Sequence, residues 1–179
     1  MVSASNGSCS SANSAQASVT TNACTGGTEL IVNGGYESGT APWVLSGNAY
    51  VQPNGSYPHT GIAYGYLGNV DNANGTEYQQ ITIPAGTSPT FAFWLNVTSA
   101  ETTTTTQYDK LFVEIRNSSG TLLATLATYS NLNKGTAGVY SQKSFNLGAY
   151  AGQAVRINFR ATTDTSLITT FRVDDVSVK

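Results

Sequence analysis

The chain has 179 residues and a net charge of −2, and only 10% of its residues are charged, against roughly 25% in an average globular protein. Its eight Lys and Arg are scattered along the sequence, so there is no basic field for nucleic acid or for an anionic membrane surface. No apolar run approaches the roughly 20 residues that a membrane helix needs, which excludes a membrane-spanning chain.

Residues 1–28 are predicted to be a polar linker or extension. They are rich in Ser, Ala, Asn and Thr and have no apolar periodicity, a composition typical of linkers. The folded domain is therefore expected to cover residues 29–179, a length that suits one domain with a substantial core.

The two cysteines, Cys9 and Cys24, lie in this extension. Two thiols are too few ligands for a metal site, and a catalytic thiol would need a nearby His. We therefore predict a disulfide between them, formed in an oxidising compartment. Titration of the oxidised protein should find no free thiol, and two reactive thiols would contradict the pairing.

From residue 29 onward the chain is a series of short apolar runs separated by Gly and Asn turns. In 110–116, Leu111, Val113 and Ile115 share one face, while the charged residues share the other with Phe112. Such alternation is typical of a strand with one buried and one largely solvated face. The predicted strands are 29–33, 49–53, 62–67, 77–83, 90–97, 110–116, 122–128, 142–147, 154–161 and 171–178, with 102–106 as a loop.

This pattern predicts an all-β sandwich of two antiparallel sheets, and it offers little support for catalysis. The single imidazole is His59, and the sequence has no Gly-x-Ser-x-Gly, Walker-type, HExxH or CxxC motif. The ten acidic residues are spread along the chain, as in an ordinary protein. A lyase or hydrolase on this fold is the weaker hypothesis.

Acidic residues at the two ends of the domain indicate a possible cation site. Adjacent Asp174 and Asp175 on one strand point to opposite faces, so one of them needs compensation for a buried charge. If the first and last strands pair, Glu37 and the carbonyls of Asn33 and Gly35 come close to them. This oxygen set suits calcium.

The competing interpretation of the two aspartates is that they are solvated at a strand end or paired with Arg172 or Arg160. Both interpretations fit the sequence spacing.

The order of several motifs resembles a known group of domains. Residues 30–39, followed by Pro42 and Trp43, resemble the "NGGFE…W" start of calcium-containing jelly-roll carbohydrate-binding modules and MAM-like domains, with Tyr36 in place of the usual Phe. Residues 173–178 resemble their "DDV" end strand. The segments 108–115, 144–153 and 156–164 are similar to C-terminal domains appended to secreted bacterial peptidases and hydrolases.

The resemblance covers residues 29–179 and implies a jelly-roll β-sandwich with an accessory role in a secreted or cell-surface protein. It also implies a structural calcium ion, held by Glu37 and by Asp174 or Asp175. Its partners would be a carbohydrate or an adjacent catalytic domain of the same chain.

Aromatic side chains in polar surroundings are the candidate carbohydrate ligands, because sugars stack on aromatic rings and bond to neighbouring polar groups. The candidates are Tyr50, Tyr57, Tyr64, Tyr66, Tyr78 and Trp94. Trp94 and Trp43 also fit a structural role, Trp94 among core strands and Trp43 as a plug under the opening segment. A stabilising or targeting domain that binds no small molecule therefore remains open.

Overall fold

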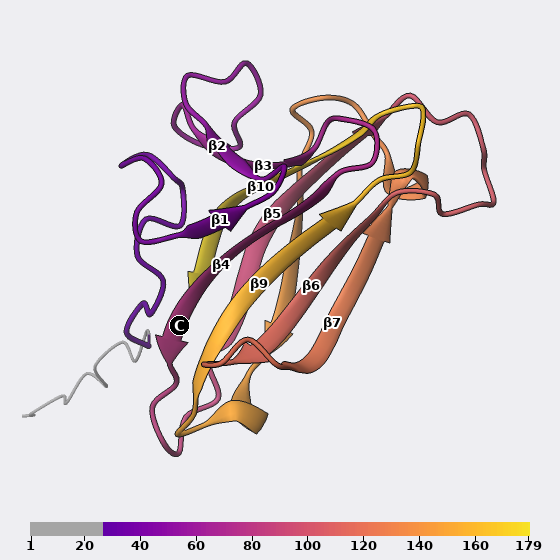
Figure 1. Cartoon of the computed structure of the whole chain (residues 1–179). Helices are drawn as coiled ribbons and strands as arrows, with labels where there is room; N and C mark the ends of the chain where they lie inside the picture. The colour runs from indigo at the N-terminus through magenta and orange to yellow at the C-terminus, as the bar shows by residue number, and fades with distance from the viewer. Residues whose placement is uncertain (1–26) are drawn as a thin grey trace, which may run out of the picture.

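The computed structural model describes residues 27–179, which form two five-stranded antiparallel sheets packed face to face (Figure 1). One sheet has the order β1-β4-β9-β6-β7 and the other β2-β3-β10-β5-β8, and we call them the β9 sheet and the β10 sheet after their central strands. Most connections cross between the sheets. The predicted all-β jelly-roll sandwich is confirmed.

The strands, in chain order, are β1 Val44–Ser46, β2 Tyr50–Gln52, β3 Tyr64–Gly68, β4 Asn74–Thr82, β5 Thr90–Ser99, β6 Lys110–Asn117, β7 Leu122–Ser130, β8 Ser141–Asn146, β9 Ala154–Thr162 and β10 Thr169–Val178. Two 3₁₀ turns, Asn131–Asn133 and Gly148–Tyr150, complete the described elements. Between residues 27 and 179 no helix has the length and apolarity needed to cross a bilayer. The predicted Cys9–Cys24 disulfide lies outside the described residues.

Nine of the ten predicted segments overlap a strand, and the predicted loop 102–106 connects β5 to β6. Segment 29–33 is the exception, because side chains accept the hydrogen bonds of two of its backbone N–H groups. Ile31 N donates to Glu29 Oε1 at 2.9 Å, and Val32 N donates to Gln79 Oε1 at 2.8 Å. The short edge strand β1 is the element that the sequence pattern missed.

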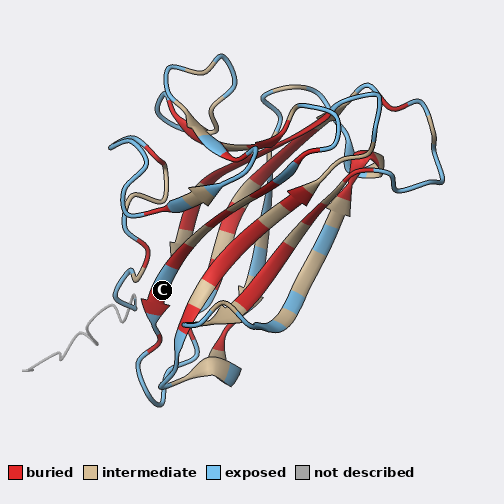
Figure 2. Cartoon of the chain, viewed as in Figure 1, coloured by how far each residue is buried: buried red, intermediate tan, exposed pale blue. Residues whose placement is uncertain are grey.

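The core lies between the sheets and is built from the alternating apolar positions of the central strands, which are red in Figure 2. Phe93 of β5 and Phe159 of β9 are fully buried, and their rings meet edge to face at 4.9 Å. Each ring contributes roughly 1.5–3 kcal/mol by leaving water. This contact joins the central parts of the two sheets.

One acidic side chain lies inside this core. Glu77 of β4 is 0% exposed, and its Oε1 accepts a hydrogen bond from the Tyr36 hydroxyl at 3.0 Å, while Oε2 has no partner. A Cβ on Gly65 of β3 would lie 2.8 Å from both carboxylate oxygens, so only glycine fits opposite Glu77. Burial raises the pKa of Glu77 to about 8, although the Tyr36 hydrogen bond lowers it.

The opening segment lies beside the last strand, as the predicted pairing of the two ends requires. Leu30 N donates to Val178 O at 2.9 Å, and Val176 N donates to Gly34 O at 3.0 Å. These are isolated hydrogen bonds and not a strand ladder. They bring the acidic residues from both ends of the domain to one region.

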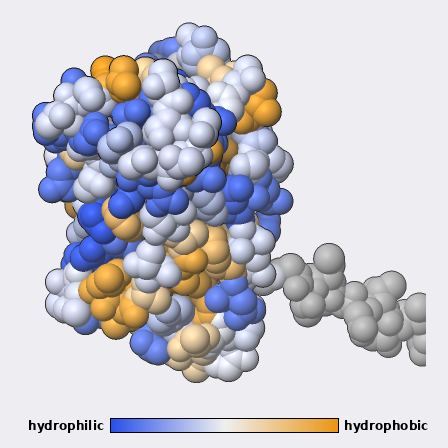
Figure 3. All heavy atoms as spheres, turned by 90° about the vertical axis from the view of Figure 1, so that its right-hand side faces the viewer, coloured by the Kyte–Doolittle hydropathy of each residue, from blue (hydrophilic) through white to orange (hydrophobic). Residues whose placement is uncertain are grey.

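The edge of the β9 sheet carries exposed apolar side chains. Figure 3 faces this edge, and orange atoms gather in its lower half, the end where β7 begins in Figure 1. Leu122 and Leu123 of β7 are 47% and 45% exposed. Blue and white atoms surround the orange regions in this view, so the apolar surface is local and not continuous along the edge.

Candidate functional site

Two acidic side chains hold the loop between β2 and β3, residues 53–63, against the opening segment and β10. Glu37 Oε1 accepts hydrogen bonds from the backbone of Ile62 and Ala63, each at 2.9 Å. Asp174 Oδ2 accepts a hydrogen bond from His59 N at 2.8 Å. The three chain segments therefore meet at carboxylate groups.

Asp174 is the buried member of the aspartate pair, at 0% exposed. It pairs with Trp94 across β10 and β5, on the outer face of the β10 sheet, so it lies beneath loop 53–63 and not between the sheets. Burial raises the pKa of Asp174 to about 6, against the lowering effect of the His59 hydrogen bond, and Asp175 raises it further.

No cation neutralises Asp174 within the described part of the chain. Arg160 binds Glu114 at 2.8 Å, and Arg172 binds Asn96 and Thr98. The alternative that pairs the aspartates with these arginines therefore does not describe the structure.

Asp175 lies at a bulge in β10, where its φ is 46°, and its backbone N donates a hydrogen bond to Asp174 Oδ1 at 2.7 Å. Its Oδ2 lies 2.6 Å from His59 Nδ1, and its Oδ1 accepts a hydrogen bond from the Thr60 hydroxyl at 2.7 Å. Asp175 thus holds the same loop as Asp174. The prediction that the two side chains point to opposite faces of the sheet is wrong, because the bulge interrupts the alternation of the strand.

Gly35 lies next to the side chains of all three acidic residues. A Cβ on Gly35 would lie 3.3 Å from Asp175 Oδ1, 3.9 Å from Asp174 Oδ1 and 3.8 Å from Glu37 Cγ. No hydrogen bond of the described residues uses the Gly35 carbonyl, whereas the Asn33 carbonyl accepts hydrogen bonds from Trp43 Nε1 and Tyr36 N. Of the two predicted carbonyl ligands, Gly35 is the available one.

The side chains alone do not form a metal centre. Within residues 27–179, no group of three or more His, Cys, Asp and Glu side chains is placed to hold a metal ion. A hard cation at Gly35 would therefore need carbonyl or water oxygens in addition to the carboxylates, which is common for calcium.

Five of the six predicted carbohydrate ligands gather on the outer side of the β10 sheet. Tyr50, Tyr66 and Arg172 occupy one row across β2, β3 and β10. The rings of Tyr50 and Tyr66 are 4.9 Å apart, and the Arg172 guanidinium lies 5.4 Å from the rings of Tyr66 and Tyr57. Tyr50 and Tyr57 are 41% and 43% exposed. We call Tyr50, Tyr57 and Tyr66 the aromatic patch.

The other predicted aromatic ligands are covered or lie elsewhere. The His59 ring stacks on Trp94 with ring centroids 3.9 Å apart, so it covers one face of the Trp94 ring. Tyr64 is only 3% exposed. Neither Trp94 nor Tyr64 therefore offers both ring faces to a sugar. Tyr78 lies on the β9 sheet, where the Arg156 guanidinium covers its ring at 4.5 Å. As predicted, Trp43 packs under the opening segment, stacked on Tyr36.

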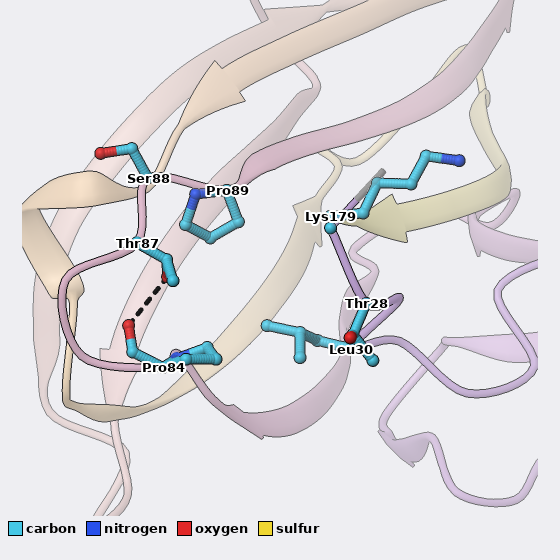
Figure 4. A pocket seen from close by; sticks show the side chains of 8 residues that line it. Thr28, Leu30, Pro84, Thr87, Ser88, Pro89 and Lys179 are labelled. Carbon is cyan, nitrogen blue, oxygen red and sulfur yellow. Dashed lines mark hydrogen bonds between the residues drawn. The ribbon is translucent and has the colours of Figure 1, made fainter. Parts of the chain in front are cut away.

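A pocket near the C-terminus lies apart from both groups. This pocket of about 490 Å³ opens between the opening segment, the β4–β5 connection and the C-terminus (Figure 4). Its lining is mostly small or apolar, with Leu30, Pro84 and Pro89, and Lys179 is its one charged residue. It therefore lacks the convergent polar groups that a small-molecule site requires.

The sequence interpretation missed the part played by loop 53–63. From the sequence, His59 is identified only as the single imidazole of the chain, yet this residue contacts both aspartates and Trp94. The signal available in the sequence was the cluster of turn formers around Tyr57 and Pro58, which predicted a loop without indicating where it would fold.

Comparison of the sequence with family models and with curated proteins finds no match. Several solved structures share the fold. The carbohydrate-binding module TmCBM61, solved in complex with beta-1,4-galactotriose, has a TM-score of 0.63 and 14% identity, over 86% of this chain and 99% of that one.

Two further structures give similar values. The K3 cleaved adhesin domain of Lys-gingipain from Porphyromonas gingivalis has a TM-score of 0.63 and 17% identity, over 84% and 97% of the two chains. A family 16 carbohydrate-binding module has a TM-score of 0.57 and 17% identity, over 84% and 99%. Identities this low establish the shared jelly-roll fold alone.

Proposed function

We propose that this chain is a non-catalytic carbohydrate-binding domain of a secreted or cell-surface protein and that the aromatic patch is its binding surface. The observation that carries the proposal is the cluster of Tyr50, Tyr57 and Tyr66 on one outer sheet face, next to the Arg172 guanidinium. The fold shared with two carbohydrate-binding modules agrees with it.

The chemistry of the patch suits a sugar. Tyrosine rings offer flat apolar faces to the C–H groups of a pyranose, and their hydroxyls bond its hydroxyl groups. Arg172 is mostly buried, and Asn96 and Thr98 bind its guanidinium, so the group between the rings is held in place before a ligand arrives. Preorganisation of this kind reduces the entropy lost on binding.

We further propose a structural calcium ion at Gly35, held by Glu37, Asp174 and the Gly35 carbonyl. The support is the position of Gly35 beside the two aspartate carboxylates and the Glu37 side chain, together with the burial of Asp174, which has no described cationic partner. Calcium would supply the missing positive charge. Because Glu37 and Asp174 both bind loop 53–63, the ion would fix the loop that carries Tyr57.

A second candidate function is a stabilising or targeting domain for an adjacent catalytic unit, with no small-molecule ligand. The observation that favours it is the stacking of His59 on Trp94, which covers one ring face of the largest aromatic on the sheet. The two candidates differ in whether the isolated domain binds any glycan.

Tyr50→Ala and Tyr57→Ala should each weaken binding to a glycan found on an array by about tenfold, because a lost stacking contact is worth about 1–1.5 kcal/mol. Tyr108→Ala is the matched control, since Tyr108 is 48% exposed but lies outside the patch, and its affinity should not change. Binding constants can be measured by calorimetry. Absence of any glycan binding would favour the second candidate function, whereas an equal loss in all three variants would refute the aromatic patch as the binding surface.

A further inference from the structure

The outer face of the β9 sheet is cationic although the chain as a whole is acidic. Lys110 and Arg116 of β6 and Arg156 and Arg160 of β9 share this face, opposite the buried apolar positions of both strands. These are four of the eight Lys and Arg of the chain. Glu114 is the one acid among the β6 and β9 residues of this face, so residues scattered in the sequence produce a local excess of positive charge.

A buried carboxylate fixes two of these cations. Glu114 was predicted on a solvated face, but its side chain is 0% exposed beneath Arg116 and Arg160. Arg116 Nε donates to Glu114 Oε2 at 2.8 Å, and Arg160 Nη2 donates to Oε1 at 2.8 Å. The two guanidinium side chains are 26% and 28% exposed, so each is held on one edge and reaches solvent on another.

Arg156 has no such compensation. It lies directly opposite Arg116 across β6 and β9, and like charges in that position are destabilising. Its described partners are the Ser118 carbonyl, bound by Nη2, and the ring of Tyr78, while its buried Nε has no hydrogen-bond partner. The positive charge of Arg156 therefore has no acidic partner among the described residues to offset the repulsion from Arg116.

The two arginines of β9 cover aromatic rings of the neighbouring strands β6 and β4. Arg160 covers the Phe112 ring at 4.0 Å, and Arg156 covers the Tyr78 ring at 4.5 Å. The two arginines are four residues apart on β9, a distance of about 13 Å at 3.3 Å per strand residue. This spacing suits an extended polymer with repeated anionic groups better than a single small ion.

We propose that the outer face of the β9 sheet binds an anionic polysaccharide through its carboxylate or sulfate groups, independently of the aromatic patch on the opposite sheet. Guanidinium groups bind such oxyanions in a bidentate fashion. The face suits a glycan better than single-stranded nucleic acid, because arginines cover Tyr78 and Phe112 and leave neither ring free to stack on a base.

The first test measures binding of the wild-type domain to four polymers at two salt concentrations. Polygalacturonate supplies carboxylates, dextran sulfate supplies sulfate esters, dextran is the neutral control, and poly(dT) is the nucleic-acid control. We expect binding to one or both anionic glycans that weakens as salt increases, and none to dextran. No binding to either anionic glycan, or equal binding to poly(dT), would overturn the proposal.

The second test uses the double variant Lys110→Gln/Arg156→Gln, whose residues have no described ion-pair partner and whose loss leaves Glu114 paired. Its affinity for the anionic glycan should fall at least about tenfold, because two charge contacts are lost. Lys143→Gln/Lys179→Gln removes the same charge elsewhere and should stay within about twofold of wild type. Equal losses in the two double variants would show a general charge effect and refute the site.

Melting temperatures check that both double variants are folded. Tyr50→Ala separates this proposal from the proposed function: it should leave affinity for the anionic glycan unchanged, whereas the Lys110/Arg156 variant should leave binding at the aromatic patch unchanged.

Discussion

Calcium should raise the melting temperature of the wild-type domain by roughly 5–10 °C over its value in chelator. An ion that binds the folded state alone stabilises it by about 2.7 kcal/mol at a hundred times its dissociation constant, and about 1 kcal/mol shifts the midpoint by roughly 2–4 °C in a chain of this size. Asp174→Asn should abolish the rise, because it removes the buried negative charge at Gly35. Differential scanning calorimetry measures both values.

Two further variants sharpen the calcium test. Glu37→Gln keeps an oxygen that can accept the Ile62 and Ala63 hydrogen bonds but removes the charge, so it should also lose the response. Asp71→Asn removes one exposed carboxylate from a turn away from the site and should keep it. An identical melting temperature of the wild type in calcium and in chelator would refute the calcium proposal.

Glu77→Gln should remove most of the loss of stability with rising pH between about pH 4.5 and pH 8. In this window the unfolded chain has ionised Glu77, whose ordinary pKa is 4.5, while the folded chain keeps its proton up to a pKa of about 8. The folded state then binds more protons, so its stability falls as pH rises, by up to about 1.4 kcal/mol per pH unit. Urea unfolding at several pH values in chelator measures the slope.

Asp174 also has a pKa raised to about 6. The test of Glu77 therefore compares how the free energy of unfolding changes with pH in the wild type and in Glu77→Gln, and not the free energy at one pH. The wild type and Glu77→Gln share the Asp174 contribution, and their difference isolates Glu77. Asp71→Asn should retain the wild-type slope. If Glu77→Gln and wild type lose stability equally across the window, Glu77 is not the protonated core carboxyl that its burial implies.

Much of the fold could be predicted because the strands have one clearly apolar face. Leu111, Val113 and Ile115 are all fully buried, as their alternation requires. The pattern was misleading where side chains replaced the backbone ladder, as in segment 29–33. It also placed Glu114 in solvent, because alternation assigns a face but does not show that one arginine of the same strand and one of the neighbouring strand will cover a carboxylate.

The candidate sites were harder to predict because they depend on contacts between distant parts of the chain. The motif resemblance brought Glu37 together with Asp174 and Asp175, and the structure places all three around Gly35. The contacts of His59 with both aspartates span more than 110 residues. Which sheet Tyr78 would join, and which tyrosines a loop would cover, depends on packing that local sequence does not encode.

The hydrogen bond from Leu30 to Val178 also determines how this domain can be connected to others. Because the opening segment and the last strand run side by side, linkers joined to residue 27 and to residue 179 would leave the sandwich close to each other. The domain could thus be inserted into a surface loop of a host protein with little distortion of either partner. A circular permutant that joins residues 27 and 179 through a few glycines, with new ends in the exposed loop 102–106, should keep the same sandwich.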